Sequence, residues 1–289
     1  MAPRGHTSQA KPDTVPARPR EAAITERTER TEGPAPTALV GGGATGIGFA
    51  VAERLAPTHR VVITGRRAGP LEKAAALLGE RTGAEVGALA ADVAAPDDAA
   101  ALLAEMTARY APPDVLVLNA GGPPPGRILD VTDDAWRSAA ELLLLGPLRL
   151  ARLALPGMAD RGFGRLVLVT STTVRQPQRD LAISVVLRAA VTAAAKLLSH
   201  EYAARGVTVN CVAPGATDTQ RRRDVLASRA ARDGRPLAEL DAVDTAAVPV
   251  GRPGTPGEIA AAVAFLASAD AGYVNGTVLT VDGGRTEAF

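Results

Sequence analysis

The stretch ALVGGGATGIGFAVAERLA, residues 38–56, joins a short apolar run to a helical pattern through a glycine-rich turn. Gly42, Gly46 and Gly48 stand in a G-x-x-x-G-x-G spacing. Glycines at such a turn let the backbone approach a pyrophosphate and let the helix pack closely against the strand. The start of the helix then offers free N–H groups and a partial positive charge to the phosphates. A tight turn without a ligand is the alternative, but a strand–turn–helix unit at the start of the folded region favours a dinucleotide site.

Seven short apolar runs follow one another along the chain, separated by longer segments with apolar residues at helical spacing. The runs are continuous rather than alternating, which is typical of parallel strands buried on both faces. Strands and helices that alternate through right-handed crossovers predict an α/β fold with a doubly wound, seven-stranded parallel sheet of Rossmann type, flanked by helices. No second core or repeat interrupts the pattern, so we expect a single domain over residues 37–289. The expected strands are residues 37–41, 60–64, 85–90, 114–119, 165–170, 207–212 and 277–281.

The charge and cysteine content exclude several classes of function. The chain has 289 residues and a net charge of +1, so nothing draws it in general to nucleic acid or anionic membranes. No run is expected to be long and apolar enough to span a bilayer. A single cysteine, Cys211, excludes an intrachain disulfide and predicts a reducing, cytoplasmic compartment. Cys211 lies in an apolar run and is expected to be buried and unreactive, and the sequence has no His/Cys cluster for a metal.

Residues 1–36 differ from the rest of the chain. The segment RPREAAITERTERTEG, residues 18–33, is charged, mixed in sign and nearly free of large apolar side chains. It offers too little apolar surface to offset the entropy of ordering, which predicts a disordered tail. The tail also lacks the apolar core of a secretory signal. A partner-binding tail is the alternative.

Two arginines, Arg66 and Arg67, follow the second predicted strand. NAD-selective folds place an acidic residue at this point to accept a hydrogen bond from the ribose 2′-hydroxyl. A carboxylate there would repel a 2′-phosphate, whereas a guanidinium binds one. NADP(H) is therefore favoured over NAD(H), with Arg66 as the phosphate ligand. Arginines that simply lie in solvent at the strand end are the alternative, which fits Arg67 better than Arg66.

Several motifs in order resemble the short-chain dehydrogenase/reductase family over residues 37–284, and within it the 3-oxoacyl-carrier-protein-reductase-like members. They are GGGATGIG at 41–48, ADV at 91–93, LNAG at 118–121, GRLVLVTS at 164–171, GVTVNCVAPG at 206–215, GRPGTPGEIAAAVAFLAS at 251–268 and VNGTVLTVDGG at 274–284. The resemblance implies a homodimer or homotetramer, in which the alanine-rich helix at 184–204 packs against a neighbour. It also implies a set of further cofactor-binding residues: Thr45 and Ile47 in the glycine loop, Asp92 and Val93 at the adenine, Asn119 and Gly121 at the adenine-side ribose and the neighbouring strand end, and Pro214 and Gly215 beside the nicotinamide.

The family's catalytic tetrad of Asn, Ser, Tyr and Lys is matched only at the serine, Ser171. Counting along the motifs places Leu143, Ser184 and Arg188 at the other three positions. Ser184 is too short and too weakly acidic to replace a proton-donating tyrosine, and a helix cap or a small packing residue is an equal alternative for it. Arg188 stays protonated and so cannot relay protons. It can still bind the nicotinamide ribose, a carboxylate or an enolate-like oxygen, and its apolar flanks disfavour a surface charge.

These residues favour an NADP(H)-dependent short-chain oxidoreductase with an atypical active site. Its substrate would be a carbonyl compound or enone, either a small molecule or one carried by a protein or coenzyme A. The alternatives are a non-redox enzyme on the same scaffold (a dehydratase, cyclase or isomerase) and a pseudoenzyme that binds nucleotide or a partner subunit. Six arginines crowd one later segment: Arg221, Arg222, Arg223, Arg229, Arg232 and Arg235. They would suit an anionic substrate, but a solvated helix whose charge is balanced by later aspartates is slightly favoured.

Overall fold

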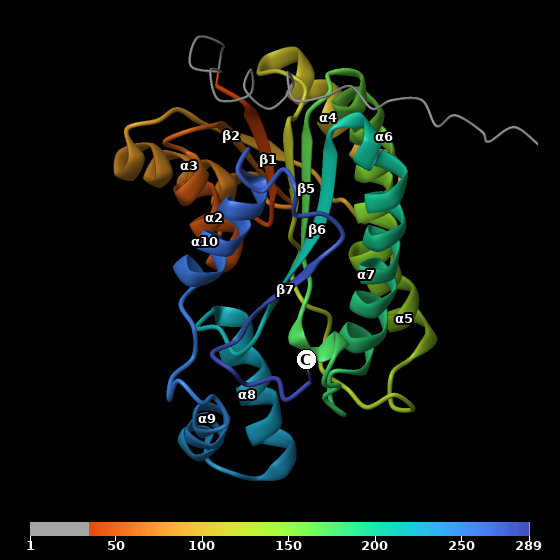
Figure 1. The fold of residues 1–289 in the computed structure, drawn as a ribbon. Coiled ribbons are helices and arrows are strands. Elements are labelled where there is room, and N and C mark those ends of the chain that lie inside the picture. Colours follow the sequence, from red (N-terminus) through yellow and green to blue (C-terminus); the bar gives the residue numbers. More distant parts are fainter. Residues whose placement is uncertain (1–34, 289) are drawn as a thin grey trace, which may run out of the picture. The chain divides into compact units, whose positions relative to one another are not determined.

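All seven expected strands are present and pair in parallel in the order β3-β2-β1-β4-β5-β6-β7 (Figure 1). The computed structural model describes residues 35–288, which belong to one unit. Residues 1–34, nearly all of the predicted tail, lie outside the described residues. The strands are β1 (Thr37–Gly41), β2 (Arg60–Gly65), β3 (Val86–Ala90), β4 (Val115–Leu118), β5 (Gly164–Val169), β6 (Val207–Pro214) and β7 (Val278–Val281). Their ends differ from the expected ones by at most two residues, and the predicted fold class is confirmed.

Helices cover both faces of the sheet, which is why the strands read as continuous apolar runs. Helices α2, α3 and α10 pack on one face, and α4, α6 and α7 on the other (Figure 1). Successive residues of β1 point to opposite faces of the sheet, so that Leu39 packs in one core cluster and Val40 in the other. The helices are α2 (Gly46–Leu55), α3 (Ala68–Thr82), α4 (Asp98–Arg109), α5 (Asp133–Ala140), α6 (Gly146–Asp160), α7 (Ala182–Tyr202), α8 (Gln220–Asp233), α9 (Leu237–Ala246) and α10 (Pro256–Ala267).

The order of the strands reverses between β1 and β4, so a crevice opens at their carboxyl ends. The glycine loop that follows β1 and the loop that follows β4 meet there. Asn119 ties the two together, because its Nδ2 donates to the backbone oxygen of Gly41 at 3.2 Å. Figure 1 shows α8 and α9 beyond the carboxyl end of β6, where they lie over this edge of the sheet. The fold therefore places the predicted motifs around one crevice.

The expectation that no segment is long and apolar enough to span a bilayer is wrong by the criteria of length and composition. The stretches Asp133–Asp160 and Ala182–Arg205 are both long and apolar enough. In the structure, 44% and 39% of their most apolar windows are buried, and α7 packs against β6 through Val191 and Ala195. An alanine-rich core helix passes the same test, which explains why the composition of these helices is ambiguous.

Candidate active site

A cavity of about 840 Å³ occupies the crevice at the carboxyl edge of the sheet. Its walls come from the glycine loop, the ends of β4 and β5, the start of α7, and the segment from β6 into α8. Eleven of the predicted site residues line it: Gly42, Thr45, Gly46, Ile47, Asn119, Gly121, Ser171, Ser184, Arg188, Pro214 and Gly215. The structure thus brings residues from five separate parts of the chain together at one cavity.

The glycine loop has the geometry of a cradle for a phosphate-bearing ligand. Gly42 and Gly46 have φ angles of 61° and 57°, which favour glycine. A Cβ on Gly48 would lie 2.2 Å from the backbone oxygen of Gly42, so α2 packs directly on the loop. Thr45 caps α2 without a side-chain hydrogen bond, and its helix therefore starts with free N–H groups at the cavity. A Cβ on Gly121 would meet no atom within 4 Å, which leaves open space opposite the loop.

Four predicted cofactor residues do not line this cavity: Gly48, Arg66, Asp92 and Val93. Gly48 is buried in the contact between loop and helix. Arg66 is exposed at the end of β2 and forms no ion pair with any residue in the described range 35–288. Asp92 is held in a local turn, because its Oδ1 accepts from the Ala94 nitrogen at 3.1 Å, and Val93 packs against the core. Their roles toward a cofactor stay predictions.

Ser171 and Ser184 both face the cavity, with different local partners. The Ser171 Oγ accepts from the nitrogen and the hydroxyl of Thr173, at 3.2 and 3.0 Å, which leaves its own proton available to a ligand. Ser184 is buried at the third position of α7. The helix is capped by Leu181, so the alternative that Ser184 is a helix N-cap is wrong.

Arg188 points into the cavity from the second turn of α7. Its Nη1 donates to the backbone oxygen of Val169 at 2.5 Å, and no carboxylate of residues 35–288 forms an ion pair with it. Burial, and after it the charge of Arg221, lower the pKa of Arg188 to about 10. The guanidinium is therefore cationic at neutral pH, and it is not a surface charge.

Leu143, which motif spacing predicts at the tetrad's asparagine position, lies in a π-helical turn between α5 and α6, Glu141–Leu145. It is buried against Ile183 and Leu187 of α7. Within the described part of the chain, no tyrosine, lysine, histidine or glutamate lines the active-site cavity. Lys196 lines a separate, smaller cavity, where its Nζ donates to the backbone oxygen of Gly276 at 3.2 Å.

Cys211 does not line the active-site cavity, but lines the smaller one. It is 1% exposed, and burial raises the pKa of its thiol to about 12. The prediction of a buried cysteine is confirmed. Such a thiol is almost entirely protonated at neutral pH and has no nucleophilic role there.

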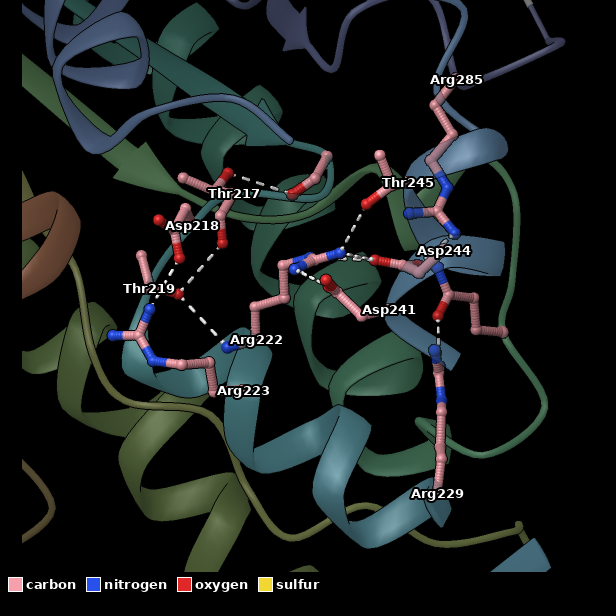
Figure 2. Close-up of polar contacts among 12 residues, drawn as sticks. Thr217, Asp218, Thr219, Arg222, Arg223, Arg229, Asp241, Asp244, Thr245 and Arg285 are labelled. Carbon is pink, nitrogen blue, oxygen red and sulfur yellow. Dashed lines mark hydrogen bonds and ion pairs between the residues drawn. The ribbon is translucent and has the colours of Figure 1, made fainter. Parts of the chain in front are cut away.

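The arginines of α8 are mostly paired with carboxylates, as Figure 2 shows for Arg222 between Asp241 and Asp244. Arg223, Arg229, Arg232 and Arg235 also have acidic partners. The prediction that later aspartates balance the charge is confirmed for Arg222 and Arg232. Arg223 and Arg229 pair instead with the earlier Asp218 and Asp180, and Arg235 pairs with Glu239. Arg221 is the exception, since it forms no ion pair with any residue in the range 35–288.

Sequence reasoning missed several residues that line the cavity. Asp244 of α9 is buried and accepts ion pairs from both Arg222 and Arg285 (Figure 2). Thr219 caps α8, and its methyl group is the nearest atom, at 3.5 Å, to a Cβ built on Gly46. The fold alone brings α9 and the segment after β7 to this site, and no local motif marks these residues.

Comparisons with known proteins agree with this architecture. The family described as enoyl-(acyl carrier protein) reductase matches residues 42–286. The 3-oxoacyl-[acyl-carrier-protein] reductase of Vibrio cholerae is 35% identical over 247 residues, covering 86% of this chain and 96% of the relative. The cis-4-hydroxycyclohexanecarboxylate dehydrogenase of Sinomonas cyclohexanicum is 36% identical over 250 residues, with the same coverage. A crystal structure of an actinorhodin polyketide ketoreductase with NADPH has a TM-score of 0.84 at 34% identity, covering 88% of this chain and 98% of that one.

One assignment follows from the parallel sheet, from the glycine loop at the point where its strand order reverses, and from these matches. The resemblance found in the sequence motifs is confirmed, and it extends over nearly all of the described residues. The chain belongs to the short-chain dehydrogenase/reductase family of oxidoreductases.

Proposed function

We propose that the protein is an NADP(H)-dependent reductase of conjugated carbonyl compounds, in which Arg188 takes the place of a proton donor. The observation that carries this proposal is a cavity with a cationic guanidinium and no tyrosine or lysine on its lining within residues 35–288. Such a site can stabilise a developing negative charge, but it has no acid of suitable pKa to hand a proton to a carbonyl oxygen.

A nicotinamide cofactor fits the residues that are present. The open space at Gly121 and the free N–H groups at the start of α2 suit the nucleotide and its pyrophosphate. Arg66 is exposed and unpaired at the end of β2, where a 2′-phosphate would need a cation. Related structures also support NADP(H), since the ketoreductase similar to this chain contains NADPH. When bound, the reduced cofactor supplies a hydride.

Arg188 and Ser171 would then act on the substrate. When the β-carbon of an enone accepts a hydride, the two electrons of the carbon–carbon double bond move toward the carbonyl oxygen, which becomes an enolate oxygen. Arg188 stabilises this oxygen electrostatically, and the free proton of Ser171 donates a hydrogen bond to it. Water then protonates the α-carbon, so no proton-donating side chain is required.

The relatives support a carbonyl or hydroxyl compound as the substrate. The Vibrio relative is named for a 3-oxoacyl group on acyl carrier protein, and the Sinomonas relative for a hydroxylated ring acid. Both a carrier-bound and a small-molecule substrate are therefore consistent with the family. We propose a small or carrier-bound carbonyl compound whose double bond is conjugated with the carbonyl group.

We also propose that the protein is a homodimer or homotetramer. Leu153 of α6 and Val186 and Leu197 of α7 are 45%, 43% and 65% exposed, so the outer faces of these two helices carry apolar side chains in water. Exposed apolar surface of this kind is favourable to bury against a second copy. A partner at these helices would leave the active-site cavity open, because the cavity lies at the edge of the sheet.

The variants Arg188→Leu and Arg188→Lys test the proposed reaction. NADPH binding is measured by fluorescence titration, and NADPH consumption by absorbance over matched enones and saturated ketones. The wild-type protein should bind NADPH and reduce enones but not saturated ketones. Arg188→Leu should lower the turnover of enones at least about a hundredfold. Arg188→Lys should keep much of the wild-type turnover, because the positive charge remains.

Two results would refute the proposed function. Absence of NADPH and NADH binding would leave the pseudoenzyme as the better reading. Equal reduction of saturated ketones would mean that a proton donor operates in this site. The combined variant Ser184→Tyr, Arg188→Lys and Leu143→Asn serves as a comparison, because it restores the tetrad and should shift activity toward saturated ketones.

A further inference from the structure

Within residues 35–288, the charged side chains on the lining of the active-site cavity are six arginines and two aspartates. Four of the arginines are paired: Arg222 with Asp241 and Asp244, Arg285 with Asp244, Arg223 with Asp218, and Arg229 with Asp180. The other two, Arg188 and Arg221, have no carboxylate of the described residues within 4.0 Å. The cavity therefore holds an excess of positive charge that the protein itself does not balance.

Arg221 lies in the first turn of α8 and reaches across to the loop after β4. Its Nη2 donates to the backbone oxygen of Pro123 at 2.6 Å. The guanidinium rests on Gly122, where a Cβ would lie 2.4 Å from Nε. Its other N–H groups have no acceptor among the described residues. Asp224 attracts it weakly, but accepts a hydrogen bond from Gln220 and makes no ion pair with Arg221.

The two unpaired arginines are held at a cost in free energy. Burial lowers the pKa of Arg221, and its charge adds to burial in lowering the pKa of Arg188. Cations that have lost part of their hydration need a partner, and two of them at one cavity repel each other. A bound anion would remove both penalties. A carboxylate suits Arg221 in particular, because its two oxygens match the planar fork of a guanidinium.

We infer that Arg221 binds a carboxylate of the substrate, so that the enzyme acts on organic acids that also carry a conjugated carbonyl group. This inference rests on the proposed function and names the substrate class for it. Arg188, which lines the same cavity as Ser171, takes the reacting oxygen, while Arg221 holds the acid group from the side of α8. A cofactor phosphate is the other anion that could meet Arg221. The phosphates, however, are expected at the start of α2, whereas Arg221 rests on Gly122 and Pro123.

Binding of matched acids and amides tests the inference. The probes are the conjugated acids 4-oxopent-2-enoate and 4-oxocyclohex-2-enecarboxylate, each compared with its primary amide, titrated calorimetrically into the protein saturated with NADP⁺. At least one acid should bind about tenfold or more tightly than its amide, as expected for a charge-assisted hydrogen-bonded pair. Arg221→Gln should abolish this preference and leave the affinity for NADPH within about twofold of wild type. Arg232→Gln is the matched control, since it removes an arginine of the same helix that does not line the cavity.

The outcomes separate the inference from the function on which it rests. Loss of the acid preference in Arg221→Gln, with the preference kept in Arg232→Gln, supports it. Three results overturn it: no acid preference in the wild-type protein, a preference that survives Arg221→Gln, or weakened NADPH binding by Arg221→Gln, which would assign Arg221 to a cofactor phosphate. If NADPH does not bind the wild-type protein at all, the proposed function is refuted, and the inference that rests on it is refuted with it.

Discussion

Replacing Gly48 by alanine would place a methyl group inside the glycine loop that we assign to the cofactor. The new Cβ would lie 2.2 Å from the backbone oxygen of Gly42 and 2.9 Å from that of Gly41, whereas ordinary contacts begin at 3.4 Å. Both neighbours are backbone atoms, so the start of α2 must move away from the end of β1 by about an ångström. Overpacking of this kind costs about 1–3 kcal/mol, which lowers Tm by several degrees.

The same displacement should weaken cofactor binding. The N–H groups at the start of α2 would no longer converge with the loop on one pyrophosphate, and we expect the Kd for NADPH to rise at least about tenfold. Gly257→Ala near the start of α10 is the control, because a Cβ there makes only an ordinary contact, 3.8 Å from the Thr255 Oγ1, and should leave both Tm and affinity unchanged or slightly improved. Thermal unfolding and fluorescence titration measure the two effects. Wild-type Tm together with wild-type affinity in Gly48→Ala would refute the reasoning.

Three further predictions concern the cofactor, the core and the assembly. Arg66→Glu should weaken NADPH binding and strengthen NADH binding, with a smaller effect from Arg67→Glu; unchanged selectivity by fluorescence titration would remove Arg66 from the site. From pH 8 to pH 10 the wild-type protein should lose about 1.4 kcal/mol more unfolding free energy than Cys211→Ala. Burial raises the pKa of the Cys211 thiol from 9.0 to about 12 in the folded state. The folded protein therefore keeps its full stability below pH 9 and loses part of it at higher pH, where the thiol ionises only in the unfolded chain. Denaturant curves that show equal losses for the wild-type protein and Cys211→Ala would contradict this. Leu197→Glu on the exposed face of α7 should dissociate the oligomer in sedimentation velocity, and a wild-type monomer would end that proposal.

The sheet could be predicted from the sequence because each strand carries its own signal. Runs such as Val115–Leu118 are apolar at every position, since helices cover both faces of the sheet. The glycine loop is equally local: its spacing reflects contacts between residues only six apart, as Gly48 and Gly42 show. The crevice then follows from the topology, because the strand order fixes which loops meet where that order reverses, between β1 and β4.

The charge pattern of the cavity could not be predicted in this way. Arg221 and Arg222 are neighbours in the sequence and both line the cavity, yet Arg221 is unpaired and Arg222 is held by two aspartates of α9. A rotation of about 100° per residue along α8 separates them. The partner of Arg229, Asp180, lies 49 residues away, in the segment before α7. Only the packing of α8 against that segment and α9 decides which arginine stays free.

The free arginines also make a prediction about pH. Within residues 35–288, the lining of the active-site cavity has no histidine, tyrosine, lysine, glutamate or cysteine, and its two aspartates are ion-paired. A family member with a proton-donating tyrosine should show that group in its rate profile, whereas here kcat/KM for an enone should stay flat from about pH 6 to pH 9. It should fall as pH rises through about 10, because Arg188 has its pKa lowered to about 10 by burial and by Arg221, and loses the charge that stabilises the enolate oxygen. Arg221→Gln removes the repulsion and should move this fall to higher pH. A bell-shaped profile centred near neutrality, in protein that circular dichroism shows to be folded, would mean that a titrating proton donor is present after all.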